Sequence, residues 1–76
     1  MQPIHLRMAR AALNWSLRVL EDKSGVGRNT ISRYEAGKEI VASSAQKIER
    51  VLIEQGMVFF EWDGAYGPGV RLRKRK

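Results

Sequence analysis

Residues 24–37 have the sequence SGVGRNTISRYEAG, and the glycines in it leave room for only one short helix. Gly25 can adopt the positive φ that ends a preceding helix, and Gly37 suits the same role at the end of this one. The intervening segment, residues 28–36, contains a single branched aliphatic side chain, Ile31, which would anchor its buried side. We therefore predict a short helix whose exposed face is polar.

Apolar side chains recur at helical spacing before this segment. Pro3 suits the first turn of a helix over residues 3–14. The apolar stripe of this helix comprises Ile4, Met8, Ala11 and Ala12, widened by Leu6, Ala9 and Leu13. A second helix follows and ends at about Lys23, with Asn14 or Ser16 as its cap. Its buried side chains are predicted to be Leu17 and Leu20.

The fourth predicted helix begins at Ser43 and ends at Gly56. Ser43 and Gln46 have the spacing of a capping box, in which each side chain satisfies a backbone N–H of the first turn. The buried stripe of this helix is predicted to be Ala45, Ile48, Val51 and Leu52.

The residues after Gly56 differ in chemistry. MVFFEW is rich in strand-forming residues, DGAYGPG is typical of a turn, and VRLR alternates apolar with basic side chains. A C-terminal β-hairpin is therefore predicted over residues 57–74. The predicted fold class is mainly α, with a four-helix domain over residues 3–56 followed by this hairpin.

Composition excludes several classes of function. A chain of 76 residues has room for one domain and no large buried pocket. Without cysteine it has neither disulfides nor thiolate metal sites. No apolar run reaches the ~20 residues of a membrane span and no signal peptide is recognisable, so we expect a cytoplasmic protein. His5 has no metal-ligating partner and is predicted to lie on the surface. No catalytic arrangement of side chains is recognisable, so we expect neither an enzyme nor a bound cofactor or metal.

The basic residues are unevenly distributed. The net charge is +6, from 14 basic and 8 acidic residues. The last six positions contain five of the basic residues: Arg71, Arg73, Lys74, Arg75 and Lys76. Residues 1–70 therefore carry nine basic against eight acidic groups, a net of only +1. Net charge alone does not identify a nucleic-acid partner, and the tail is either a solubilising end or an arm that follows DNA phosphates.

Two short helices joined by a glycine-containing turn form the helix-turn-helix pattern. Within residues 7–56, four segments resemble the phage repressor/Cro-type helix-turn-helix domain, the XRE family: ALNWSL, KSGV, RNTISRYEAGK and SAQKIERVLIEQG. The resemblance covers about two-thirds of the chain. It implies a bundle of helices whose third member enters the major groove of double-stranded DNA.

The resemblance places Arg28, Asn29 and Arg33 at the base-reading positions of the third helix. Their chemistry agrees with this role, because arginine can donate to guanine O6 and N7 together and asparagine can pair with adenine N6 and N7. The residues expected to contact the DNA backbone are Ser16, Arg18, Thr30, Ser32, Lys38 and Ser43.

The resemblance also implies an internal ion pair between Arg10 and Glu35. Three positions depart from the family pattern. Leu17 replaces a glutamine that contacts phosphate, and Gly27 replaces the serine or threonine cap of the third helix. Glu21 replaces an alanine over which the third helix crosses closely. Either the Glu21 carboxylate turns sideways, toward a basic residue, or the two helices cross differently.

As a strand, MVFFEW would be apolar on both faces, with Met57, Phe59 and Glu61 on one and the alternate residues on the other. A small helical domain can cover only one face. The second face is then covered either by the chain's own helix end or tail, or by another subunit. We favour a homodimer, and its predicted interface is Val58, Phe60, Trp62, Val70 and Leu72.

The predicted function is transcriptional regulation, with repression favoured. The resemblance implies a homodimer that binds a palindromic operator in the major groove, with half-sites about 34 Å apart. The alternative is an antitoxin-like or adaptor protein whose apolar hairpin binds a partner protein. A regulatory protein partner is compatible with either function. RNA binding ranks last, because the basic side lacks an aromatic surface on which bases can stack.

Overall fold

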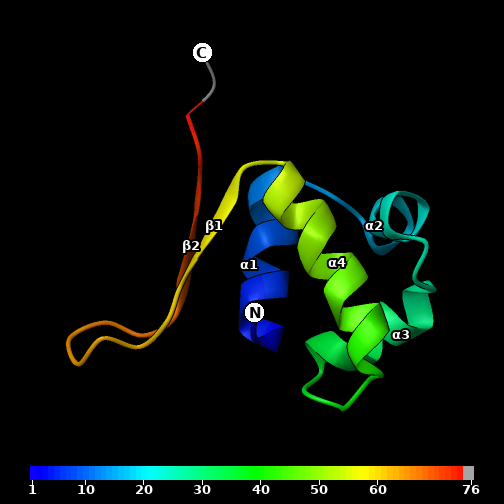
Figure 1. The fold of residues 1–76 in the computed structure, drawn as a ribbon, viewed down its shortest axis with the longest axis horizontal. Helices are drawn as coiled ribbons and strands as arrows, with labels where there is room; N and C mark the ends of the chain where they lie inside the picture. Colours follow the sequence, from blue (N-terminus) through cyan, green and yellow to red (C-terminus); the bar gives the residue numbers. More distant parts are fainter. Residues whose placement is uncertain (75–76) are drawn as a thin grey trace.

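The computed structural model describes residues 1–74 as four helices followed by a two-stranded antiparallel hairpin (Figure 1). The elements are α1 (Pro3–Leu13), α2 (Leu17–Ser24), α3 (Arg28–Glu35), α4 (Ala42–Glu54), β1 (Met57–Phe60) and β2 (Gly69–Leu72). The predicted mainly α fold class is thereby confirmed. The last two residues of the basic tail, Arg75 and Lys76, lie outside the described part of the chain, and so does that part of the tail prediction.

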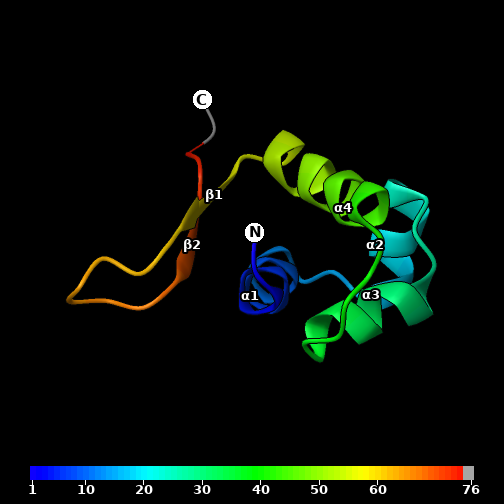
Figure 2. The same cartoon turned by 60° about the horizontal axis from the view of Figure 1, so that its bottom comes forward.

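The hairpin and the α2–α3 pair occupy opposite sides of the molecule. In both views α1 and α4 stand between them (Figures 1 and 2). The hairpin packs on α1 through β2, and β1 follows α4 almost directly along the chain. Any surface formed by the outer side of α3 is therefore separated from any surface formed by the hairpin.

The core receives side chains from all four helices and from β1. Its buried apolar side chains are Leu6, Ala9, Leu20, Val26, Ile31, Ile48, Leu52 and Met57. In α1 the buried side is formed by Leu6 and Ala9, with Leu13 packed beside them. Ile4 and Ala11 are exposed, so the stripe predicted through these two residues is wrong. Both stripes have helical spacing, and the one that contains two leucines removes more apolar area from water.

The break between α1 and α2 is made by two polar residues. Ser16 is the cap of α2, because its Oγ accepts a hydrogen bond from the backbone N–H of Val19 at 3.1 Å. Asn14, the other candidate, instead ends α1 in the left-handed conformation at φ 57°. Gly25 ends α2 at φ 75°, as its position in the sequence predicted.

The start of α4 differs from the prediction. The helix begins at Ala42 with Val41 as its cap, and no side chain caps it. Ser43 is therefore already inside the first turn, and the predicted capping box between Ser43 and Gln46 is wrong. The helix can start earlier because the backbone of Val41 is extended and its carbonyl accepts from the N–H of Ala45 at 3.2 Å.

The hairpin has a single register. Met57 lies opposite Leu72, and Phe60 lies opposite Gly69. One further bond extends the pairing toward α4, since the N–H of Arg73 donates to the carbonyl of Gly56 at 2.7 Å. Because directly opposed residues share a face, this register decides which side chains of β2 accompany those of β1.

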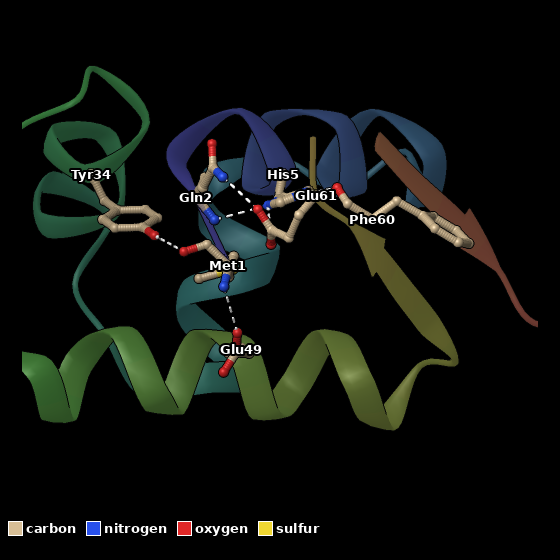
Figure 3. Close-up of polar contacts among 7 residues, drawn as sticks. All are labelled: Met1, Gln2, His5, Tyr34, Glu49, Phe60 and Glu61. Atoms are coloured by element: carbon tan, nitrogen blue, oxygen red, sulfur yellow. Dashed lines mark hydrogen bonds and ion pairs between the residues drawn. The ribbon is translucent and has the colours of Figure 1, made fainter. Parts of the chain in front are cut away.

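His5 is fully buried, so its predicted position on the surface is wrong. Figure 3 shows its ring between the start of α1 and the hairpin. The N–H of Gln2 donates to Nδ1 at 2.9 Å, and Nε2 donates to the carbonyl of Phe60 at 2.7 Å. A backbone N–H can only donate and a carbonyl can only accept, so the ring hydrogen lies on Nε2. His5 therefore caps the start of α1 and fastens it to β1.

The first residues of the chain extend these polar contacts to α3 and α4 (Figure 3). The Met1 amino group pairs with Glu49 at 3.0 Å, and the Tyr34 hydroxyl donates to the Met1 carbonyl at 2.9 Å. The Gln2 amide donates to the Glu61 carboxylate. Burial raises the pKa of Tyr34 above its usual 10.0, and the Glu49 carboxylate raises it further, so the hydroxyl keeps its proton.

Candidate nucleic-acid interface

The outer side of α3 is polar and faces solvent. Its exposed side chains are Arg28, Asn29, Ser32 and Arg33. Ile31, on the other side of the helix, is fully buried and anchors α3 in the core. Asn29 and Arg33 are one turn apart and share a face, and Arg28 is the first residue of the helix, directly before Asn29. The three predicted base-reading side chains therefore all belong to one solvent-facing side of a short, anchored helix.

Arg10 fixes the position of α3 against α1. Its Nε donates to Glu35 Oε2 at 2.6 Å and its Nη2 donates to Glu35 Oε1 at 2.9 Å, which is a two-pronged contact. Its third nitrogen, Nη1, donates to the carbonyl of Trp15 at 2.9 Å. One guanidinium thus joins α1, the break before α2 and the end of α3, and the structure contains the ion pair that the sequence resemblance implied.

The surroundings of Arg10 keep its guanidinium in the charged form. The hydrogen bond to Glu35 raises the pKa of Arg10 above its already high usual value, against the opposing effect of burial. Arg7 adds a second tie, because its Nη1 donates to the backbone carbonyl of Glu35 at 2.7 Å. The end of α3 is therefore held by two arginines of α1, and the polar side of α3 is fixed before any ligand binds.

Glu21 caps the start of α3. Its Oε2 accepts from the backbone N–H of Arg28 at 3.1 Å, and its Oε1 accepts from the side-chain Nε of Arg28 at 3.0 Å. Gly27, the residue at the cap position, has no side chain with which to do this. Of the two possibilities left open for Glu21, the structure has the first, in which the carboxylate turns toward a basic residue. The sequence had indicated the missing cap and the surplus carboxylate, but not that one compensates for the other.

The predicted backbone-contacting residues belong to the cap and first turn of α2, to α3 itself, to the loop after α3 and to the first turn of α4. Arg18 in the first turn of α2, Lys38 after α3 and Ser43 in the first turn of α4 are exposed. Ser16 is also exposed, and because its oxygen only accepts from Val19, its hydroxyl hydrogen is free to donate. Thr30 is half-buried and borders a shallow hollow between α3 and α4, which is lined by Thr30, Arg33, Glu39, Ile40, Val41 and Ser44.

The predicted interface residues of the hairpin do not share one face. Val58 and Phe60 point away from the helices, with exposed fractions of 39% and 43%, and the Arg71 guanidinium lies 5.9 Å from the centre of the Phe60 ring. Val70 is opposite Phe59 and packs on the core with it, so it does not belong to the outer face. Leu72 lies opposite the buried Met57, so it belongs to the same face of β2 as Val70, although it is exposed and its edge borders the same hollow as Val58 and Phe60.

Trp62 lies beyond the end of β1, in the hairpin loop, and is largely exposed. Its ring is next to Gly67, where an added Cβ would come within 3.4 Å of the ring carbons. Trp62 thus contacts the opposite side of its own loop. The prediction that it continues the outer face of the strand is not met, because β1 ends at Phe60.

Over residues 1–74, no group of three or more histidine and acidic side chains is arranged to hold a metal ion. None of the helices in the same region has the length and apolar content needed to cross a membrane.

One comparison with known proteins gives a match. A family model described as helix-turn-helix matches residues 6–53, which include all of α2 and α3 and most of α1 and α4. A search of curated proteins found no match.

Proposed function

The chain belongs to the helix-turn-helix family of XRE type, a non-enzymatic family of DNA-binding domains, and on this premise we propose that it is a sequence-specific transcriptional regulator. The proposal is that α3 enters the major groove of an operator and that the protein acts by occupying that site. Repression is the favoured sign, since occupancy alone can block a promoter and requires no further contact.

The observation that carries this proposal is the way in which α3 is held against the rest of the fold. Its inner side is fixed by Ile31, and its end is fixed by the contacts of Arg7 and Arg10 with Glu35. Its outer side keeps Arg28, Asn29 and Arg33 in solvent. A helix fixed in this way loses little conformational freedom when it enters a groove, so its contacts translate efficiently into affinity.

In this proposal the three outer side chains read base edges. Arg28 and Arg33 would each donate to guanine, and Asn29 would pair with adenine. Each such two-pronged contact discriminates against the wrong base by roughly 1–3 kcal/mol. The backbone contacts are assigned to Ser16, Arg18, Thr30, Ser32, Lys38 and Ser43, which add affinity that weakens with salt but no sequence information.

We further propose that two copies bind together through the hairpins. Support comes from the outward Val58 and Phe60, and the exposed Leu72, which belongs to the other face of the hairpin, borders the same hollow. The chain measures 33 × 31 × 19 Å, comparable with the ~34 Å between successive major grooves on one side of DNA, so two copies can sit on adjacent turns. Val70 is left out of this interface because it packs on the core.

The test of this function is selection of binding sequences from a randomised duplex pool, followed by fluorescence anisotropy with the selected duplex across a salt series. We expect a palindrome to be enriched. Arg28→Ala and Arg33→Ala should each weaken binding to it by about tenfold or more while leaving binding to unrelated duplexes much less affected. Arg50→Ala is the matched control, because Arg50 is an exposed arginine of α4.

Binding that is equal for all duplexes, and that is weakened as much by Arg50→Ala as by Arg28→Ala, would contradict sequence-specific regulation. It would leave only charge-driven association, which the basic tail can provide.

A second candidate function rests on the apolar surface of the hairpin loop. Trp62 and Tyr66 are exposed by 73% and 75%, and Tyr66 borders a shallow hollow together with the exposed Phe60. Such neighbouring aromatic side chains are typical of protein-binding surfaces. An adaptor or antitoxin-like protein would bind its partner there and would keep doing so when Arg28 and Arg33 are replaced.

A further inference from the structure

The contact between Glu21 and Arg28 does more than cap a helix. Capping requires one acceptor for the backbone N–H of Arg28, and Oε2 supplies it at 3.1 Å. The second oxygen, Oε1, accepts from the side-chain Nε of the same residue at 3.0 Å. A carboxylate from α2 thus holds both the backbone and the side chain of the first residue of α3.

This contact determines which hydrogens of Arg28 remain available. An arginine side chain has five N–H donors, one on Nε and two on each terminal nitrogen. Guanine O6 and N7 require two donors side by side. Arginine can offer them either as Nε with one terminal nitrogen, or as the two terminal nitrogens. With Nε bound to Glu21, the terminal pair is left.

The exposed fractions of Glu21 and Arg28 agree with this assignment, in which Nε contacts Glu21 and the terminal nitrogens remain available. The Arg28 side chain is 54% exposed, whereas that of Glu21 is 30% exposed. The carboxylate is therefore the more enclosed partner, and the part of Arg28 beyond Nε extends into solvent from the outer side of α3. A long side chain restrained in this way before binding loses less rotamer freedom when it contacts a base.

We propose that Glu21 is a positioning residue that presents the terminal nitrogens of Arg28 to guanine, so that each half-site contains a G·C pair at the start of α3. This inference rests on the proposed function. The inference also predicts an effect on the affinity for DNA in general, because a carboxylate near the phosphates repels every DNA sequence equally. Glu21 should therefore weaken binding to DNA in general while sharpening the preference for guanine at one position.

The experiment uses the duplex selected by the unmodified protein and three further duplexes that differ at the base pair read by Arg28. That base pair is identified as the one whose preference Arg28→Ala removes. Competition anisotropy with each protein gives the discrimination, defined as the ratio of affinities for the guanine duplex and for its best competitor. The proteins are the unmodified chain, Glu21→Gln, Arg28→Ala and the double variant.

Glu21→Gln is the informative change, because its amide oxygen can still accept from the backbone N–H of Arg28. Asp22→Asn is the matched control: it removes the same charge from the next residue of α2, whose side chain is exposed. Thermal unfolding checks that both variants are folded. Arg28→Lys is a second route if Glu21→Gln is unstable, since it keeps the backbone contact and the charge but has neither the Nε that Glu21 holds nor the rigid planar pair of terminal nitrogens.

We expect the unmodified protein to discriminate by about tenfold or more. Glu21→Gln should reduce this ratio by at least threefold, while Asp22→Asn leaves it unchanged. Both should raise the affinity for unrelated duplexes by a similar factor. In the Arg28→Ala background, Glu21→Gln should have no effect on the ratio. Arg28→Lys should reduce the discrimination of the unmodified protein, because a lysine ammonium is not held by Glu21 in a fixed planar orientation.

Two outcomes would overturn the inference and leave the proposed function in place. Equal discrimination by Glu21→Gln and Asp22→Asn would mean that Glu21 only caps α3. Tighter binding of the guanine duplex by Glu21→Gln, with discrimination kept or increased, would mean that Glu21 withholds Arg28 from DNA. An unmodified protein that shows no sequence preference would overturn both the inference and the proposed function.

Discussion

Arg10 uses one guanidinium to join three parts of the fold, and its partner Glu35 is 11% exposed. Replacing Glu35 by glutamine leaves the charge of Arg10 half-buried without a counter-charge. We expect a loss of about 1–3 kcal/mol in the free energy of unfolding, less than for a fully buried pair because Arg10 is reached by solvent. Urea unfolding followed by circular dichroism measures it.

The control for this prediction is Glu39→Gln, which removes the same charge from an exposed position in the loop after α3. It should change the free energy of unfolding by no more than about 0.5 kcal/mol. Equal effects of the two substitutions would show that the Arg10–Glu35 contact adds nothing to stability.

Asp63 organises the hairpin loop in a pH-dependent way. Hydrogen bonds from the backbone N–H groups of Tyr66 and Ala65 lower the pKa of Asp63 below its usual 3.8. A pKa that is lower in the folded state adds stability above the usual value, and this stability is lost as the pH falls through the folded pKa. The loop should therefore loosen only below pH 3.8.

Amide proton shifts of Ala65 and Tyr66, followed by NMR during acid titration, test this prediction. Asp63→Asn should keep the loop ordered, because an amide oxygen can accept the same bonds, and should abolish the titration. Asp63→Ala should abolish both the order of the loop and the titration. A midpoint at or above 3.8 in the unmodified protein would contradict the assignment.

Single residues also show where prediction from sequence stops. The Arg10–Glu35 pair could be foreseen because both positions belong to a recognisable pattern. The burial of His5 could not, because its acceptor is the carbonyl of Phe60, 55 residues away. The role of Glu21 was left between two alternatives, since the choice depended on how α2 crosses α3. Contacts that depend on tertiary placement are not encoded in local spacing.

At the scale of elements, the middle of α3 has one fully buried anchor. Among the residues of α3, all of which the structure describes, Ile31 is the only fully buried side chain, and Tyr34 is only partly buried against the core. Ile31→Ala should cost about 2–5 kcal/mol, a large share of the stability of a domain this small. Native-state hydrogen exchange should show loss of protection in α3 together with the rest of the fold.

Val51→Ala is the comparison, because Val51 is only half-buried on the longer helix α4, which also buries Ile48 and Leu52. It should cost clearly less than Ile31→Ala. If α3 keeps its protection in Ile31→Ala, the contacts of Arg7 and Arg10 would be sufficient to hold it.

Elements were predicted with unequal success for a physical reason. Glycines and prolines fix backbone conformation locally, so Pro3 at the start of α1 and Gly25 at the end of α2 were placed correctly. The buried face of α1 was not, because two apolar stripes have the same period and only packing distinguishes them. The start of α4 was displaced because Val41, which has no capping side chain, occupies the cap position.

At the scale of the whole molecule, assembly is the property to measure. Replacing Val58 and Phe60 together by serine removes the outward apolar surface of the hairpin without touching the core. We expect sedimentation analysis to give a dimer for the unmodified protein and a monomer for the variant. Affinity for a palindrome should then fall by about 100-fold or more, because the second half-site no longer benefits from the first.

Ile53→Ser provides the control, since Ile53 is a comparably exposed apolar residue of α4. It should leave the dimer intact. An unmodified protein that remains a monomer at concentrations where it saturates its operator would contradict assembly through the hairpin.

The position of α1 between α3 and the hairpin has a consequence for operator spacing. Arg7 and Arg10 tie α1 to α3, and His5, near the start of the same helix, ties α1 to β1. The span between the two surfaces is thus set by the width of one packed helix, about 10–12 Å, and not by a flexible linker. In a dimer this fixed span sets the relative position of the two α3 helices. One extra base pair between half-sites turns the second half-site by about 35°, and rigidly joined subunits cannot follow this rotation. The operator should therefore tolerate base changes more readily than a change of length.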